Sequence, residues 1–170
     1  MQDDVTDAVK WAVDQKIADP NRICIFGASY GGYAAMMGLA TTPDLFRCGI
    51  NYVGVTDIPL MLETIPLAWE IAREELTLQA GDRKTDLDRL KKTSPVNLAN
   101  QIKAPVLMAY GSRDPRVVLD HGRRMEAALK AEGVPVELII KKNEGHRFAK
   151  FENQVEWAQR ILDFLAQHLG

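Results

Sequence analysis

The chain has 170 residues, 46% hydrophobic and 26% charged, which suits one globular domain with its own core. Its net charge of −2 gives no field that would attract nucleic acid or an anionic membrane, and no apolar run is long enough to span a bilayer. Because the acidic start MQDDVTDAVKWAV has no signal-peptide pattern, and because Cys24 and Cys48 make no CxxC motif or disulfide framework, we expect a cytoplasmic protein that binds neither nucleic acid nor membrane.

The first third of the chain predicts two helices and two strands in alternation. Apolar residues at helical spacing predict an amphipathic helix over residues 4–17, which Asp19-Pro20 ends. A short apolar run predicts a strand over residues 22–26. A segment rich in Ala, Met and Leu predicts a helix over residues 30–41, and a strand is expected over residues 48–53.

The remainder of the chain continues the alternation after a less regular segment. Residues 55–95 contain helical character at residues 69–76 and then a charged run. Beyond them, the pattern predicts a strand, a helix, a strand and a helix over residues 106–110, 118–132, 136–141 and 152–169.

This alternation indicates an α/β fold, with a mainly parallel sheet and helices on both faces. The strands are continuously apolar, as strands buried on both faces should be. Sites in open α/β sheets form outside the carboxyl ends of the strands. The residues that follow each predicted strand are therefore the candidates for chemistry.

A serine lies between two glycines directly after the first predicted strand, in the stretch GASYGGY. Gly27, Ser29 and Gly31 form GxSxG at a junction from strand to helix, which is the motif that exposes a nucleophilic serine in α/β-hydrolases. The strained turn requires small neighbours, and the helix that follows would direct the N–H of Tyr30 at a developing oxyanion. A P-loop is excluded because no GK[ST] follows.

A nucleophilic serine needs a general base, and the chain has three histidines. His146 follows the fourth predicted strand and thus falls at a carboxyl end, where a base is needed. His121 and His168 fall within predicted helices, where we interpret them as surface or partly buried residues.

The base in turn needs an acid to orient it. Asp114 follows the third predicted strand, while Asp57 after the second strand and Asp120 in a helix are the rivals. The order Ser29, Asp114, His146 is the chain order of the α/β-hydrolase triad, and each of the three follows a different strand.

Three segments, GASYGGYAAMMGLA, AYGSRDPRV and EGHRFAKFENQVEWAQRILDFL, together resemble the catalytic domain of the prolyl oligopeptidase family of serine peptidases, in its acylaminoacyl-peptidase and dipeptidyl-peptidase-like branch. The resemblance covers nearly the whole chain. It implies an α/β-hydrolase fold, Ser29 as nucleophile, Asp114 as acid, His146 as base and the N–H of Tyr30 as one oxyanion donor.

The chain departs from the family pattern in two ways. Arg116-Val117 is followed by valine where the family usually has proline. In the family, this region is preceded by several strands, by an HGGP-like loop that supplies the second oxyanion donor, and by a β-propeller. None of these is found here, so residues 1–170 are expected to be the C-terminal portion of a truncated α/β-hydrolase domain. We expect the exposed edge of the strand at 22–26 to make the chain a homo-oligomer, for example a dimer.

The expected function is a serine peptidase acting on peptides or acyl-peptides through an acyl-enzyme. Alternatives are an esterase of the dienelactone-hydrolase type acting on small esters, and a folded but inactive fragment that self-associates. No metal-ligand spacing or nucleotide fingerprint is present, so neither a metal nor another cofactor is expected. Tyr33, Val55 and Trp69 are candidates for substrate binding, although packing explains apolar residues there equally well.

Overall fold

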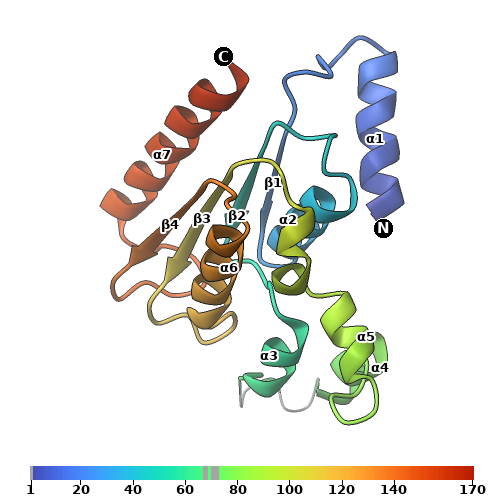
Figure 1. Cartoon of the computed structure of the whole chain (residues 1–170). Coiled ribbons are helices and arrows are strands. Elements are labelled where there is room, and N and C mark those ends of the chain that lie inside the picture. The colour runs from blue at the N-terminus through green and yellow to red at the C-terminus, as the bar shows by residue number, and fades with distance from the viewer. Residues whose placement is uncertain (1, 67–68, 70–72) are drawn as a thin grey trace.

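Four parallel strands form a sheet in the order β1-β2-β3-β4 in the computed structural model, which describes residues 2–66, 69 and 73–170 (Figure 1). The strands are β1 (Cys24–Ala28), β2 (Cys48–Tyr52), β3 (Val106–Gly111) and β4 (Val136–Lys141). Every residue of β3 is buried, whereas β1 and β4 at the edges are partly exposed. The apolar run VLMAYG thus occupies the interior of the sheet, as its lack of polar alternation predicts.

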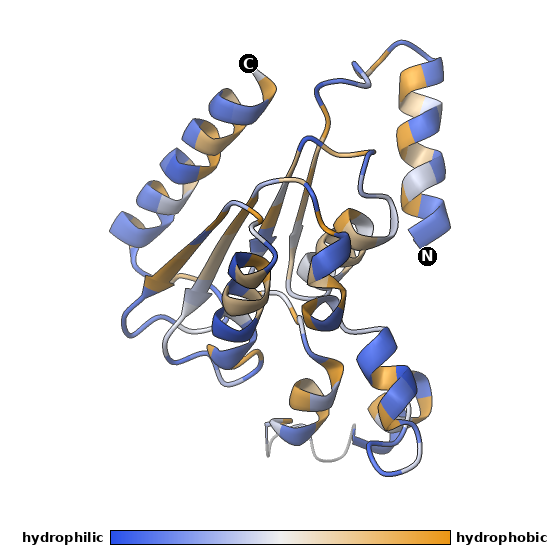
Figure 2. Cartoon of the chain, in the orientation of Figure 1, coloured by the Kyte–Doolittle hydropathy of each residue, from blue (hydrophilic) through white to orange (hydrophobic). Residues whose placement is uncertain are grey.

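Helices cover both faces of the sheet, as the sequence predicts. On one face lie α2 (Tyr30–Thr41) and α6 (Asp120–Ala131), with α1 (Gln2–Asp14) packed beside α2 (Figure 1). The other face is covered by α7 (Phe151–Leu169), which turns an apolar stripe toward the sheet and a hydrophilic side outward (Figure 2). Each face has its own hydrophobic cluster.

A chain of short helices connects β2 to β3. They are α3 (Ile58–Glu63), α4 (Arg73–Ala80), α5 (Leu87–Lys92) and the 3-10 helix η2 (Pro95–Gln101). In Figure 1, α3, α4 and α5 lie beyond the end of the sheet at which the strand arrowheads point. Of the helix expected at 69–76, residues 70–72 lie outside the described part, and the observed α4 begins at Arg73.

The predicted boundaries of the first two elements shift for local reasons. The helix expected over residues 4–17 ends at Asp14, because Lys16 has a φ of 58° and the Ile17 N–H reaches back to the Ala12 carbonyl at 2.8 Å, which closes the last turn. The strand expected over residues 22–26 runs to Ala28, which pairs with Tyr52 in β2. The strand therefore ends directly before Ser29.

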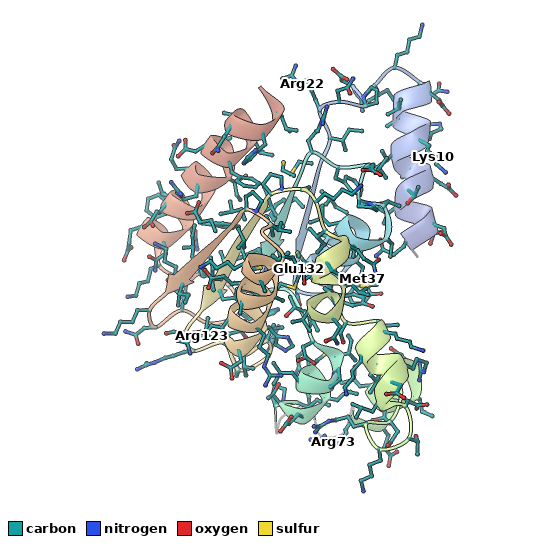
Figure 3. All side chains as sticks on the ribbon, in the orientation of Figure 1. Lys10, Arg22, Met37, Arg73, Arg123 and Glu132 are labelled. Carbon is teal, nitrogen blue, oxygen red and sulfur yellow. The ribbon has the colours of Figure 1, made fainter. Side chains whose placement is uncertain are left out.

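The C-terminal helix is tied to the start of the first strand. The Arg22 guanidinium, labelled in Figure 3, donates its Nε hydrogen to the Leu169 carbonyl at 2.6 Å and also donates to the carbonyl of Gly170. A cation is favoured at these unpaired carbonyls at the C-terminal end of a helix. This contact joins α7 to the N-terminal end of β1.

Candidate active site

Ser29 lies alone between strand and helix, because β1 ends at Ala28 and α2 begins at Tyr30. Its φ of 56° and ψ of −119° are a backbone conformation that a residue with a side chain seldom adopts. The turn is held by a hydrogen bond from the Ser29 N–H to the Tyr52 carbonyl at 2.9 Å. A β-carbon at Gly27 would collide with the Gly31 carbonyl, so this position of the motif admits only glycine.

The three residues predicted from separate strand ends form one hydrogen-bonded line. His146 Nε2 is 2.8 Å from Ser29 Oγ, and His146 Nδ1 is 2.8 Å from Asp114 Oδ2. The Asp114 carboxylate can only accept, so His146 Nδ1 carries the proton and Nε2 is the acceptor for the serine hydroxyl. This is the arrangement in which an imidazole can take the serine proton.

Asp114 is fixed by its own loop as well as by the imidazole. Its side chain is fully buried, and Oδ1 accepts hydrogen bonds from the backbone N–H groups of Arg116 at 2.8 Å and Val117 at 3.0 Å. These bonds hold the carboxylate in one orientation, with Oδ2 facing His146.

Ser29 and His146 line an open cleft of about 960 Å³. Tyr52 and Arg147 also line the cleft, and neither is among the residues predicted from the sequence. Tyr52 ends β2, so its position at a carboxyl end was the available signal. Burial raises the pKa of the Tyr52 phenol, whose oxygen accepts the Phe148 N–H at 2.7 Å.

The rival acids and bases have structural partners elsewhere. Asp57 caps α3 by accepting the Leu60 N–H at 3.0 Å and pairs with Arg124 at 2.8 Å. His121 is buried, and its Nδ1 accepts the Thr56 N–H at 3.2 Å. The remaining two rivals are Asp120, 4.0 Å from Arg123 Nη1, and His168, stacked edge-on against Phe164.

The three candidates for substrate binding fall in different places. Tyr33 and Val55 line a second cavity of about 370 Å³ together with Tyr30, the residue after the serine. Trp69 lines neither this cavity nor the cleft; it is 41% exposed, and the Arg116 guanidinium lies 5.4 Å from its ring centre. Because Arg116 lines the cleft, Trp69 packs on a cleft-lining residue but does not line the cleft itself.

Within residues 2–66, 69 and 73–170, no group of three or more His, Cys, Asp or Glu side chains is placed to hold a metal ion. In the same part of the chain no helix is both long and apolar enough to cross a membrane.

Comparison with known proteins places the chain among peptidases. The sequence profile of the prolyl oligopeptidase family matches residues 1–170. The chain belongs to this family. Relatives in the family include dipeptidyl aminopeptidase BIII of Pseudoxanthomonas mexicana, 40% identical over all of this chain and 25% of the relative, and an acylamino-acid-releasing enzyme of Arabidopsis thaliana, 31% identical over 82% of this chain and 19% of the relative. The chain thus spans about a quarter or less of the length of these relatives.

Solved structures of the family share the fold described above. A puromycin-hydrolysing peptidase of Mycobacterium tuberculosis matches 96% of this chain and 24% of its own with a TM-score of 0.89 and 29% identity. Acylaminoacyl peptidase of Pyrococcus horikoshii matches 98% of this chain and 27% of its own with a TM-score of 0.85 and 25% identity. The resemblance to the acylaminoacyl- and dipeptidyl-peptidase branch and the α/β-hydrolase fold are therefore confirmed.

Proposed function

We propose that this chain carries the nucleophile, base and acid of a serine peptidase: Ser29, His146 and Asp114. The observation that carries the proposal is the unbroken line of two 2.8 Å hydrogen bonds from Asp114 through His146 to Ser29. This line of hydrogen bonds ends at Ser29, which lies in a strained turn and lines the cleft. Membership of a peptidase family supports the same assignment.

The chemistry follows from the positions of the protons. His146 Nε2 takes the proton of Ser29 Oγ as the oxygen attacks a substrate carbonyl carbon. The carbonyl oxygen becomes an oxyanion, for which the N–H of Tyr30 at the start of α2 is the proposed donor. The protonated His146 then gives its proton to the departing amine, which leaves an acyl group on Ser29. Water, deprotonated by His146, hydrolyses this ester and regenerates the serine.

The proposed substrate is a peptide or an N-acylated peptide. The names of the relatives describe dipeptide release, acylamino-acid release and puromycin hydrolysis by those proteins. In this chain the cavity lined by Tyr30, Tyr33 and Val55 begins at the residue next to Ser29 and is mostly apolar, so we propose that it receives an apolar side chain beside the bond that is cut.

A fluorophosphonate probe tests the assignment because it reacts only with an activated serine. We expect labelling of the wild-type chain and its loss in Ser29→Ala. Ser94→Ala is the control that keeps the labelling, because Ser94 is buried and its hydroxyl bonds to Leu90 and Ile58 rather than to His146. Relative rates on aminoacyl amides and p-nitrophenyl esters then distinguish a peptidase from an esterase. A wild-type chain that never labels would contradict the proposal.

We also propose that the chain self-associates through β1. Among the described residues β1 pairs only with β2, and Phe26 on this strand is 55% exposed, so an unpaired strand edge lies beside apolar surface. We expect light scattering at micromolar concentration to find a dimer or larger species, reduced by Phe26→Lys. Phe151→Lys changes an exposed phenylalanine on α7 and serves as the control. A monomeric wild type would refute the idea.

A further inference from the structure

A buried carboxylate lies in the loop that carries the proposed base. Glu144, two residues before His146, is 1% exposed. Its Oε2 accepts the Ala149 N–H at 2.6 Å, and its Oε1 accepts the Lys150 N–H at 3.1 Å and the Asn153 amide at 2.5 Å. The carboxylate thus bridges from one side of His146 to the other and closes the loop around it.

The environment of Glu144 keeps the group charged. Burial acts to raise the pKa of the carboxyl, but the hydrogen bonds from Asn153, Ala149 and Lys150 favour the anion, and the net effect is a lowered pKa. Two of these donors are the backbone N–H groups of Ala149 and Lys150, which directly precede α7, and the amino end of that helix also favours an anion. A neutral amide in this place would be a poorer acceptor for the same three donors.

The backbone of Glu144 also contacts the loop that carries the proposed acid. The Arg113 N–H donates to the Glu144 carbonyl at 2.9 Å, next to Asp114 in the chain. A β-carbon at Gly111 would collide with that same carbonyl, so the two loops meet backbone against backbone. Glu144 is therefore one of the residues at which the loop of His146 and the loop of Asp114 are joined, and among these it is the one whose side chain also accepts three hydrogen bonds.

Glu144 touches neither Ser29 nor the side chain of His146 in any hydrogen bond of the described residues, so its effect must pass through the loop. The charged and titratable groups around the loop are Lys150 and Arg147 on the loop itself, Tyr52 on β2, and Asp114 on the neighbouring loop. None of them replaces the three hydrogen bonds that the carboxylate accepts.

We propose that Glu144 is a positioning residue: its carboxylate holds the loop of residues 144–150 against the first turn of α7, so that the imidazole of His146 meets Ser29 and Asp114 at the same time. The inference rests on the proposed function for its kinetic consequences, although the geometry it predicts is independent of activity.

The test compares Glu144→Gln, Glu144→Ala and Asn153→Ala with the wild-type chain. A misplacement of about 1 Å can cost about 10²-fold in rate, so we expect fluorophosphonate labelling and kcat to fall about 10- to 100-fold in Glu144→Ala. The loss should be smaller in Glu144→Gln, which retains an acceptor, and in Asn153→Ala, which removes one donor. KM should change less than kcat, because Tyr52, Val53 and Arg116, which also line the cleft, lie outside this loop.

Leu129→Ala is the matched control, because Leu129 is fully buried in α6 near the amino ends of the strands, away from the site. It should lower Tm without altering kcat. If the Glu144 variants lower Tm as it does and label at the wild-type rate, the proposal is overturned.

Nitrogen chemical shifts of the His146 imidazole provide the readout that needs no activity. We expect them to move in Glu144→Ala and not in Leu129→Ala. If the wild type fails to label, the proposed function is contradicted, and these shifts still decide the role of Glu144: unchanged shifts in Glu144→Ala overturn it.

Discussion

Two glycines flank Ser29 in the motif, and only one of them is required by space. A β-carbon at Gly27 would collide with the Gly31 carbonyl, whereas nothing lies within 4 Å of a β-carbon at Gly31. The other glycine that space requires is Gly32, where a β-carbon would collide with the Asn51 side chain and with the α-carbon of Gly54. The need for small neighbours around the serine is thus met at Gly27 and Gly32.

This difference predicts opposite effects for the two alanine variants. Gly27→Ala should lower the free energy of unfolding by about 1–3 kcal/mol, the range for overpacking a tight site. Gly31→Ala should be neutral or raise it by up to about 1 kcal/mol, since alanine is the better helix former. Urea unfolding of both variants checks the pair, and equal destabilisation by the two would contradict this account.

At Asp114 the prediction concerns catalysis rather than stability. In Asp114→Asn, the amide that replaces the carboxylate no longer sets the imidazole tautomer, so kcat should fall by up to about 10⁴-fold. Asp120→Asn changes a neighbouring aspartate on α6 that pairs only distantly with Arg123, and it should retain activity. Steady-state kinetics on an aminoacyl amide measures both, and a loss shared by both variants would point to a structural cause.

At the scale of elements, His121 joins α6 to the segment after β2. Its Nδ1 accepts the Thr56 N–H, its carbonyl accepts the Thr56 hydroxyl at 2.8 Å, and its Nε2 has no hydrogen-bond partner among the described residues. Burial lowers the pKa of His121 to about 4, from an ordinary value of 6.5; Asp57 opposes this shift, while the Arg124 guanidinium adds to it. The folded protein therefore holds this imidazole neutral.

A stability change with pH follows from that shift. Between about pH 6.5 and 4 the unfolded chain binds the proton and the folded chain does not, so stability falls as the pH falls, by about 3 kcal/mol in total. The contribution is fully present above pH 6.5. Urea unfolding of the wild type and His121→Gln across this window measures it: the wild type should show the steeper loss, and parallel curves would contradict the prediction.

At the scale of the whole molecule, α7 is the only helix on its face of the sheet among the described residues (Figure 1). Phe164 and Trp157 are its buried residues, and they pack on the cluster that contains Ile50 and Leu107. This face also supports the His146 loop, because α7 begins where that loop ends. Loss of α7 packing should therefore destabilise the whole domain.

Phe164→Ala tests that packing. We expect a loss of about 3–5 kcal/mol in the free energy of unfolding, the range for removing a buried aromatic ring. Phe151→Ala removes a phenylalanine that is 76% exposed on the same helix and should change stability by less than about 0.5 kcal/mol. Calorimetric or urea unfolding distinguishes the two, and similar losses would mean that α7 packing is not the cause.

Local pattern was sufficient for the four strands and for α1, α2, α6 and α7, but not for the short helices between β2 and β3. Continuous apolar runs correspond to the four strands, and the predicted 136–141 and 30–41 segments match β4 and α2 residue for residue. The observed end of α1 differs from the predicted one because Lys16 has a positive φ, and the end of β1 differs because Ala28 pairs with β2. The irregular 55–95 segment was the least predictable, since its short helices pack on one another rather than follow a long periodicity.

The order of the elements and the strand-end positions of Ser29, Asp114 and His146 could be predicted from the amino-acid sequence, because hydrophobic periodicity and the GxSxG turn are properties of neighbouring residues. Only the tertiary structure brought residues 117 and 32 positions apart to 2.8 Å from one another. It also decided that Asp57 caps a helix, that Tyr52 lines the cleft and that Glu144 is buried among three donors. Those outcomes depend on the direction of each side chain and on the hydrogen-bond partners that other loops provide. Neither can be predicted from the spacing of residues in the sequence.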